Sequence, residues 1–285
     1  MDQETELLVE AITSLKSEPN YFKDYAFPIA SAFFTSILGA AIAYFTLRHQ
    51  EGVQIEKEKM DATNKWTLNA EEARSTLFAM KGNYHGELNE NPFQRIMSIP
   101  SILFKAKPLT EDFQGLSFIV PVGSDTEDEI PKWSQIPRVR IMVSNYNYLL
   151  ELWEQRNTLN EQFKSRVFEV HGDNGRMALS KDEIIQAVGQ AFLVTFTDLN
   201  ERVIRLTDDI ILELDNFLME FPKYAKSKIQ VKRLKRYGSI LMHSNNENPV
   251  ILELLKKSPD PDSQILSEII GEPEEAIRQR HATGY

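Results

Sequence analysis

Apolar residues recur at helical spacing along most of the chain. The longest series begins at Ile185 and ends at Phe221, with steps of three and four residues throughout. Such steps place side chains on one helix face, so the series predicts a single helix of about 40 residues that stops at Pro222. Its members are Ile185, Val188, Phe192, Phe196, Leu199, Val203, Leu206, Ile210, Leu214, Phe217 and Phe221.

Two further series predict helices earlier in the chain. One starts at Trp66 and is expected to end between Asn89 and Pro92, because the residue before a proline disfavours helical geometry. The other starts near Val139 and is interrupted by two asparagines. The members are Trp66, Ala70, Ala73, Leu77, Met80, Tyr84 and Leu88 in the first, and Met142, Tyr146, Leu149, Trp153, Phe163 and Val167 in the second, with Asn157 and Asn160 as the interruptions.

Less regular segments join these helices. Residues 92–137 are rich in proline and carry an acidic run at 125–129. Within them we expect a short helix near 93–104 and a tucked extended segment at 116–122. After a Gly-Asp-Asn-Gly loop at 172–175, Ser180 and Glu183 have the spacing of a capping box, which predicts a helix start. Beyond Ser244, two short helices are expected at 250–257 and 263–270.

The segment Tyr25–Leu47 holds 23 residues without a charge. As a helix it would measure roughly 35 Å, enough to cross a hydrocarbon core of about 30 Å. A cleaved signal peptide and a buried soluble helix are the alternatives, but the acidic N-terminal flank does not resemble a signal peptide's basic start. Arg48, Lys57, Lys59 and Lys65 follow the segment and only Lys16 and Lys23 precede it, which places the C-terminal part in the cytoplasm.

The sequence therefore predicts a mostly α protein with a single N-terminal transmembrane helix, followed by a soluble antiparallel helical bundle whose long helices pair as in a coiled coil. The expected divisions are an N-terminal flank at 1–24, the transmembrane helix at 25–47 and a charged, solvated helical stalk at 48–65. The helical bundle domain follows at 66–244, with its irregular proline-rich part at 92–137, and short helices form the tail at 245–285.

Composition narrows the function classes. The formal charge of -10 argues against general nucleic-acid binding, which rewards a basic surface. The chain contains no cysteine, so disulfides, thiolate nucleophiles and cysteine-based zinc sites are excluded. Its five histidines have no pair at helical spacing, and we expect neither a metal nor a cofactor.

Two acidic features are candidates for a metal-binding or catalytic role. If Glu183 is the last ligand of a calcium loop at 171–183, Met177 falls where an EF-hand requires glycine, so a plain turn is favoured. Asp198 with Glu201, and Asp208 with Asp209, could supply acid and base groups, but a solvated helix face is the favoured interpretation. With no catalytic motif in the chain, we expect that the protein is not an enzyme.

One local exception to the acidic charge stands out. Between Phe221 and Ser244 there are seven basic residues and no acidic one. This segment could dock anionic lipid, nucleic acid or an acidic partner, or could simply neutralise neighbouring acidic helices. The seven residues are Lys223, Lys226, Lys228, Lys232, Arg233, Lys235 and Arg236.

Small residues recur at four-residue steps within the apolar segment. They would let two such helices approach closely in lipid, which predicts self-association. These residues are Ala32, Ser36, Gly39, Ala40 and Ala43. Taken together, the patterns favour a membrane-anchored interaction or scaffold protein with a protein partner. The alternative is a membrane effector or signalling subunit whose bundle senses a ligand or partner and acts through associated spans.

Overall fold

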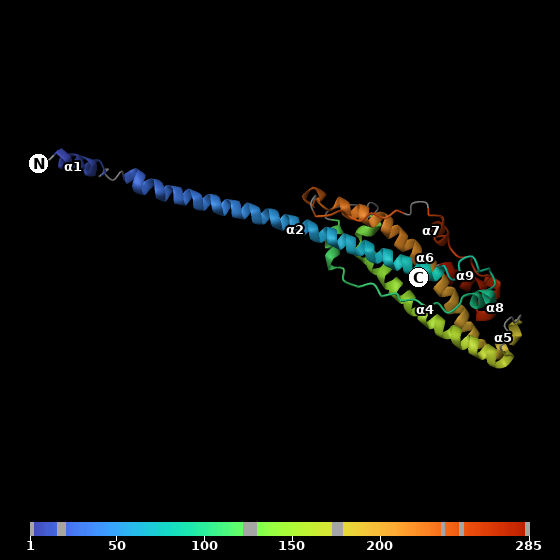
Figure 1. The fold of residues 1–285 in the computed structure, drawn as a ribbon. Coiled ribbons are helices and arrows are strands. Elements are labelled where there is room, and N and C mark those ends of the chain that lie inside the picture. The colour runs from blue at the N-terminus through green and yellow to red at the C-terminus, as the bar shows by residue number, and fades with distance from the viewer. Residues whose placement is uncertain are drawn as a thin grey trace. The chain divides into compact units, whose positions relative to one another are not determined.

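The computed structural model describes residues 3–15, 21–121, 130–172, 179–234, 237–244 and 248–282. Within these ranges the chain is mostly helical and contains no β-strand, which confirms the predicted helical class (Figure 1). The chain divides into two compact units, Met1–Ile55 and Glu56–Tyr285.

The helices follow one another with few long interruptions. They are α1 (Gln3–Leu15), the π-helical turn η1 (Phe22–Ala26), α2 (Phe27–Lys81), α3 (Pro92–Ser98), the 3₁₀ turns η2 (Gln114–Ile119) and η4 (Lys132–Ser134), α4 (Ile136–His171), α5 (Lys181–Val188), α6 (Gln190–Ser227), the 3₁₀ turn η5 (Val231–Leu234), α7 (Pro249–Leu254), α8 (Ser263–Ile270) and α9 (Glu274–Ala282).

The first unit holds the apolar segment at the start of α2. The most apolar stretch of Phe22–Lys81 has a mean hydropathy of 1.8, and none of that stretch is buried. Pro28 lies in the first turn of α2, where its missing N–H removes no helical hydrogen bond. By length and composition, this part of the chain fits a membrane span or an N-terminal signal sequence.

The second half of α2 belongs to the second unit and carries the predicted apolar series, all of which is buried. Trp66, Leu77 and Tyr84 are 3%, 0% and 0% exposed. The helix ends earlier than expected, at Lys81, so Tyr84 lies in a turn and Leu88 lies in the irregular chain after it. Asn83 explains this end, because its side-chain amide donates to the carbonyls of Ala79 and Met80. A short polar side chain that bonds the last carbonyls competes with continuation of the helix.

The charged segment 48–65 is helical, as expected, but the expectation that it is solvated is wrong for its second part. Glu56, Met60 and Thr63 are 4%, 3% and 0% exposed. Their spacing of four and three places them on one face of α2, in phase with Trp66. The core of the second unit therefore begins about three turns before the predicted bundle boundary.

A large hydrophobic core joins α2, from Trp66 onward, to α4 and α6, and these last two helices lie side by side (Figure 1). The indole N–H of the fully buried Trp153 donates to the Thr207 hydroxyl at 3.0 Å. The Trp133 ring meets Phe217 edge to face, with centroids 4.9 Å apart. A second cluster forms around Phe163 and Phe196 near α5 and α8.

The predicted single helix of 185–221 is wrong at both ends. It is interrupted at Gly189, whose φ of 83° lies in the left-handed region that favours glycine, and this residue separates α5 from α6. The predicted apolar face is also displaced by one residue on each side of Gly189. Ile184 and Leu193 are buried, whereas the predicted Ile185 and Phe192 are only partly buried. The capping box of Ser180 and Glu183 is confirmed at the start of α5.

At the other end, α6 continues through Pro222 to Ser227. A proline inside a helix costs about 3 kcal/mol. Phe221 and Ala225 are completely buried on the two sides of Pro222, and burial of an aromatic side chain of this kind offsets much of that cost. Hydrophobic packing on both sides therefore outweighs the helix-breaking effect of Pro222.

The irregular part of the chain differs in detail from the expectation. The helix expected near 93–104 is only Pro92–Ser98, capped by the Asn91 side chain, which accepts from the Phe93 N–H. Leu116 and Ile119 are buried as expected, but they belong to a 3₁₀ turn instead of an extended segment. The acidic run at 125–129 and most of the 172–175 loop lie outside the described residues. Of the predicted tail helices, α8 is confirmed, α7 is shorter than expected, and α9 was not predicted.

Candidate functional site

The basic segment is the main candidate surface, and its described basic residues are all exposed. Lys223 and Lys226 lie in the last turns of α6, and Lys228 is its C-cap residue. Lys232 and Arg233 follow in η5. Lys235 and Arg236, the other two predicted members, lie outside the described residues. Basic side chains suit the C-terminal end of a helix, where the helix dipole is negative.

A buried carboxylate fixes the middle of this segment against α2. The Glu56 carboxylate accepts the Gln230 backbone N–H at 2.6 Å and the Lys59 ammonium at 2.8 Å. Burial favours the neutral acid, but these two hydrogen bonds and the charges of Lys59 and Arg233 outweigh it, so the pKa of Glu56 lies below its usual range. Glu56 is therefore ionised at neutral pH and holds the start of the segment in place.

Hydrophobic and polar contacts extend this attachment along two turns of α2. Met60 packs in a small core with Ile229, Leu234 and Ile240. The Asn64 side chain donates to the Ser239 carbonyl at 3.1 Å and accepts the Leu241 N–H at 2.8 Å.

An aromatic residue adds a third kind of contact. The Tyr237 hydroxyl donates to the Asp61 carboxylate at 2.8 Å, and the Lys57 ammonium lies 4.2 Å from the centre of the same ring. Together, Glu56, Met60, Asp61 and Asn64 bind residues 229–234 and 237–241 to the part of α2 where the second unit begins.

The exposed cations of this segment are not bound in close ion pairs with the acidic helices. Across the part of the chain that the structure describes, none of Lys223, Lys226, Lys228, Lys232 and Arg233 forms an ion pair within 4.0 Å. The Lys228 ammonium instead lies 5.3 Å from the centre of the Tyr224 ring. The charges of the segment are thus directed to solvent.

The interpretation of the acidic pairs as a solvated helix face is wrong for Glu201 and Asp208, which are 2% and 4% exposed. The reason is that α6 is covered on more sides than its apolar series indicates. Asp198 and Asp209 are half-buried. Each of the two buried carboxylates is paired with a buried cation from another helix.

Glu201 binds Arg95 of α3. The Arg95 Nε lies 2.9 Å from both carboxylate oxygens, and Nη2 lies 2.8 Å from Oε2. The remaining guanidinium N–H groups donate to the carbonyls of Asn89 and Pro259, at 3.1 and 2.7 Å. Burial raises the pKa of Glu201, and the positive charge of Arg95 opposes that rise.

Lys81 and Asp208 form the second buried pair, with nitrogen and oxygen 2.7 Å apart. The Asp208 carboxylate also accepts the Ser258 N–H at 2.6 Å, and the Lys81 ammonium donates to the Lys256 carbonyl. Both pairs therefore hold the C-terminal segment 256–259 against the helices.

A third buried cation, Arg156 of α4, has only neutral acceptors. Its guanidinium donates to the carbonyls of Ile99 and Pro100 at 2.7 and 2.8 Å and to the Asn200 amide oxygen at 3.2 Å. Burial lowers the pKa of Arg156 to about 10. Even so, it remains charged at neutral pH and fixes the segment that follows α3.

The two asparagines that interrupt the α4 series have a similar role. Asn157 accepts the Ile102 N–H at 3.1 Å and donates to the Ile102 carbonyl at 2.8 Å. Asn160 donates to the Ser101 hydroxyl at 2.8 Å. Both amides are thus used to hold residues 101 and 102, which gives the interruption a structural reason.

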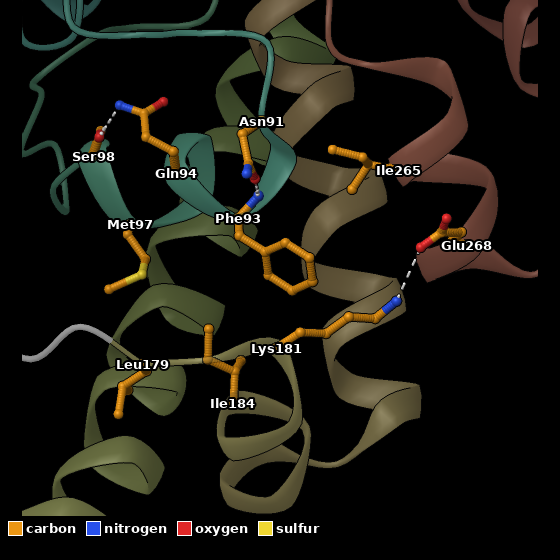
Figure 2. A pocket seen from close by; sticks show the side chains of 10 residues that line it. All are labelled: Asn91, Phe93, Gln94, Met97, Ser98, Leu179, Lys181, Ile184, Ile265 and Glu268. Carbon is orange, nitrogen blue, oxygen red and sulfur yellow. Dashed lines mark hydrogen bonds and ion pairs between the residues drawn. The ribbon is translucent and has the colours of Figure 1, made fainter.

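A solvent-open pocket of about 640 Å³ lies where α3, α5 and α8 meet (Figure 2). Its apolar lining comes from Phe93, Met97, Leu179, Ile184 and Ile265. At its rim, Lys181 and Glu268 form an exposed ion pair at 3.3 Å.

The amides that line this pocket already have partners within the protein. The Gln94 amide donates to the Glu87 carbonyl at 2.7 Å and to the Ser98 hydroxyl at 2.6 Å, and its oxygen accepts the Asn89 N–H at 3.1 Å. Asn91 accepts the Phe93 N–H at 2.9 Å. The pocket can therefore take an apolar group, with its rim ion pair as the nearest charge.

The small residues of the predicted span are exposed and lie along α2. A side-chain carbon added at Gly39 would meet no atom within 4 Å, so the chain itself leaves that face open. The Ser36 hydroxyl donates to the Ala32 carbonyl of its own helix at 2.8 Å. Ala40 and Ala43 complete the series on this helix.

Among the described residues, no group of three or more histidine, aspartate or glutamate side chains is arranged to hold a metal ion. No protein-family model matches the chain, and neither a curated protein nor a solved structure shows significant similarity to it.

Proposed function

We propose that this chain is a membrane-anchored helical interaction protein, in which a span at the start of α2 holds a soluble helical domain at the membrane. The observation that carries the proposal is the apolar stretch of α2, with a mean hydropathy of 1.8 and no burial by the protein's own side chains. Water would hydrate such a surface at a cost of about 25 cal/mol for each Å², and a bilayer removes that cost.

The continuity of α2 favours a retained span over a cleaved signal sequence. The same helix that begins at Phe27 contributes Trp66 and Leu77 to the main core. Cleavage near Ala41 or Ala43, the small residues that resemble a cleavage site, would cut within a regular helix. The acidic flank before the segment also lacks a signal peptide's basic start.

We also propose that the soluble domain is an antiparallel bundle. Residue numbers fall along α6 as they rise along α2, from Arg74 paired with Asp215 to Lys81 paired with Asp208. The same order relates α4 to α6, because Trp153 bonds Thr207 and Phe163 packs on Phe196. Packing of this kind buries one face of each long helix without a cofactor.

The proposed orientation places the helical domain in the cytoplasm, since four basic residues follow the apolar segment and two precede it. The open face at Gly39 supports self-association of the span, because small residues let two backbones approach closely in lipid. Self-association and a separate protein partner are compatible parts of the same anchoring role.

A second candidate function is that of a membrane effector or signalling subunit whose helical domain senses a ligand. The pocket between α3, α5 and α8 favours it, because a hollow of about 640 Å³ with apolar walls falls in the size range of small-molecule sites. The interaction role remains the first choice because the amides lining this pocket are hydrogen-bonded within the protein.

The anchoring proposal is tested with the full chain expressed in a host membrane. The wild type should stay in the pellet after a high-salt wash and an alkaline carbonate wash. Leu38→Arg should shift much of the protein to the soluble fraction, because an arginine at the centre of a span costs about 2.5 to 3.5 kcal/mol on the insertion scale. Leu38→Ala is the matched control and should stay in the pellet.

Release of the wild-type protein by carbonate would contradict the anchor. The interaction role itself is tested by chemical crosslinking in the same membranes, followed by mass spectrometry. Reproducible crosslinks from the helical domain to one other protein would support the interaction role. If the domain instead binds a small molecule that protects the pocket lysine Lys181 from acetylation, the sensing role replaces it.

A further inference from the structure

The basic segment has a second property that its charges alone do not reveal. Large apolar side chains on and directly after it are exposed: Val231, Tyr237, Leu241 and Met242 are 39%, 45%, 40% and 48% exposed. Single exposed apolar side chains are common on soluble surfaces, but these four lie on one segment together with its exposed cations. Basic residues interleaved with exposed apolar and aromatic ones are typical of segments that lie in a membrane interface.

The chain also limits how far this segment can lie from the proposed span. It is bound to Glu56, Met60 and Asn64 of α2, and Glu56 follows Leu47 by nine residues. Nine helical residues measure about 14 Å, and even a fully extended chain reaches only about 32 Å. Headgroups extend roughly 5 to 8 Å beyond the hydrocarbon core, and charges act over a Debye length of about 8 Å.

The segment is attached firmly enough to present these side chains together. The ionised Glu56 holds Gln230, the Met60 core holds Ile229, Leu234 and Ile240, and Asn64 holds Leu241. The backbone that carries the exposed cations therefore does not need to be ordered at the moment of contact. A surface that is ordered in advance loses less conformational entropy on binding.

We propose that the described residues 223–234 and 237–242 form a second membrane-contact surface, which takes the anionic headgroups of the bilayer that holds the α2 span. The exposed lysines and Arg233 bind the headgroup phosphates and carboxylates, and the exposed apolar side chains enter the interfacial zone. This surface rests on the proposed anchor and adds to it a preference for anionic lipid. The contact would fix the helical domain against one leaflet instead of leaving it free on its stalk.

The absence of cysteine in the chain allows a direct test on the full-length protein. Val231→Cys, next to the Gln230 that Glu56 holds and therefore at the end of the segment nearest the span, is labelled with an environment-sensitive fluorophore. The protein is reconstituted into nanodiscs of neutral phosphatidylcholine or of phosphatidylcholine with roughly 30% phosphatidylserine. Insertion predicts a blue shift of the emission in anionic discs only, and loss of that shift at high salt.

A pair of charge variants separates this surface from net charge. Lys226→Gln, Lys228→Gln and Lys232→Gln are combined in one protein, and Lys105→Gln, Lys107→Gln and Lys164→Gln in the control. Each basic side chain near the surface contributes about fivefold, so the first protein should lose roughly 100-fold in docking and with it the blue shift. The control should keep the shift, and circular dichroism should be the same for both proteins.

Three results would overturn the proposal: equal emission in neutral and anionic discs, equal loss in both charge variants, or a shift produced by added RNA or duplex DNA instead of lipid. Failure of the anchor is recognised separately. If the protein does not elute with neutral nanodiscs in 1 M salt, roughly the condition that screens charges beyond 3 Å, the span is absent and the proposed function fails first.

Discussion

Two groups of cations in this chain lie in opposite environments, one buried among hydrogen-bond acceptors and the other exposed to solvent. Lys81, Arg95 and Arg156 are 1%, 1% and 0% exposed, and each is surrounded by acceptors from two or more segments. The five described cations of the basic segment are exposed and form no ion pair with any described residue. The difference teaches that charge in this protein has two uses, one inside the helical domain and one on its surface. The interior group should control stability, and the surface group should control binding.

The largest effect is expected from Arg95→Met. It would leave the Glu201 carboxylate buried without its partner, and an unpaired buried charge costs about 3 to 5 kcal/mol. The free energy of unfolding of the full chain in detergent, measured with denaturant, should fall by about that amount. The double variant with Glu201→Met should recover part of the loss, whereas Arg278→Met, at the exposed pair with Glu274, should change little.

Arg156→Met should cost less, about 2 to 3 kcal/mol, because it strands neutral acceptors and no charge. The same denaturation experiment measures it. If the loss equals or exceeds that of Arg95→Met, the charge of Glu201 is not what makes the first substitution severe. Arg156→Lys is the matched control and should recover only part of the stability, since a lysine cannot reach three acceptors in the plane of a guanidinium.

Glu56→Gln tests the link between the interior and the surface, because Glu56 is buried and yet holds the exposed basic segment. The pKa of Glu56 is lowered in the folded protein, so its charge contributes stability above pH 4.5 that is lost as the pH falls through the folded-state pKa. At pH 7 the substitution should cost about 1 kcal/mol. Melting curves of the two proteins should converge as the pH falls through the folded-state pKa of Glu56, which lies below its usual range. A difference that persists in acid would show that the hydrogen bonds, and not the charge, hold Gln230.

The smallest effect on stability is expected from the combined Lys226→Gln, Lys228→Gln and Lys232→Gln protein. Solvated side chains without ion pairs contribute little to folding, so the melting temperature should change by less than about 2 °C. A marked drop, measured by circular dichroism against the Lys105, Lys107 and Lys164 control, would mean that these charges balance the acidic helices. The distinction between an interior and a surface group would then disappear.

Periodicity predicted much of the fold because it records which face of each helix is covered. The series from Trp66 to Leu88 is buried throughout, and the capping box at Ser180 marks the start of α5 as expected. Helix ends were less predictable, because they depend on single residues in competition with packing. Gly189 interrupted a series that looked continuous, whereas Pro222 did not end α6 between the buried Phe221 and Ala225.

The candidate surface was predicted in its charges but not in its attachment. Nothing in the local sequence links Glu56 to Gln230 or Asn64 to Leu241, since these contacts join residues more than 170 positions apart. The buried carboxylates were misassigned for the same reason. A cation within an apolar series, as Lys81 lies close to Leu77 and Tyr84, is the signal that could have indicated a buried pair.

The hold of Lys81, Arg95 and Asp208 on the segment 256–259 has a consequence for the order of folding during synthesis. Ribosomes add about 5 to 20 residues each second, so α2, α3 and α6 leave the exit tunnel seconds before their partners at Lys256, Ser258 and Pro259. During that interval the nascent helices hold polar groups whose acceptors and donors do not yet exist. The domain can close its interior only when residue 259 is free, which makes emergence of the segment 256–259 a condition for the native packing of helices formed much earlier.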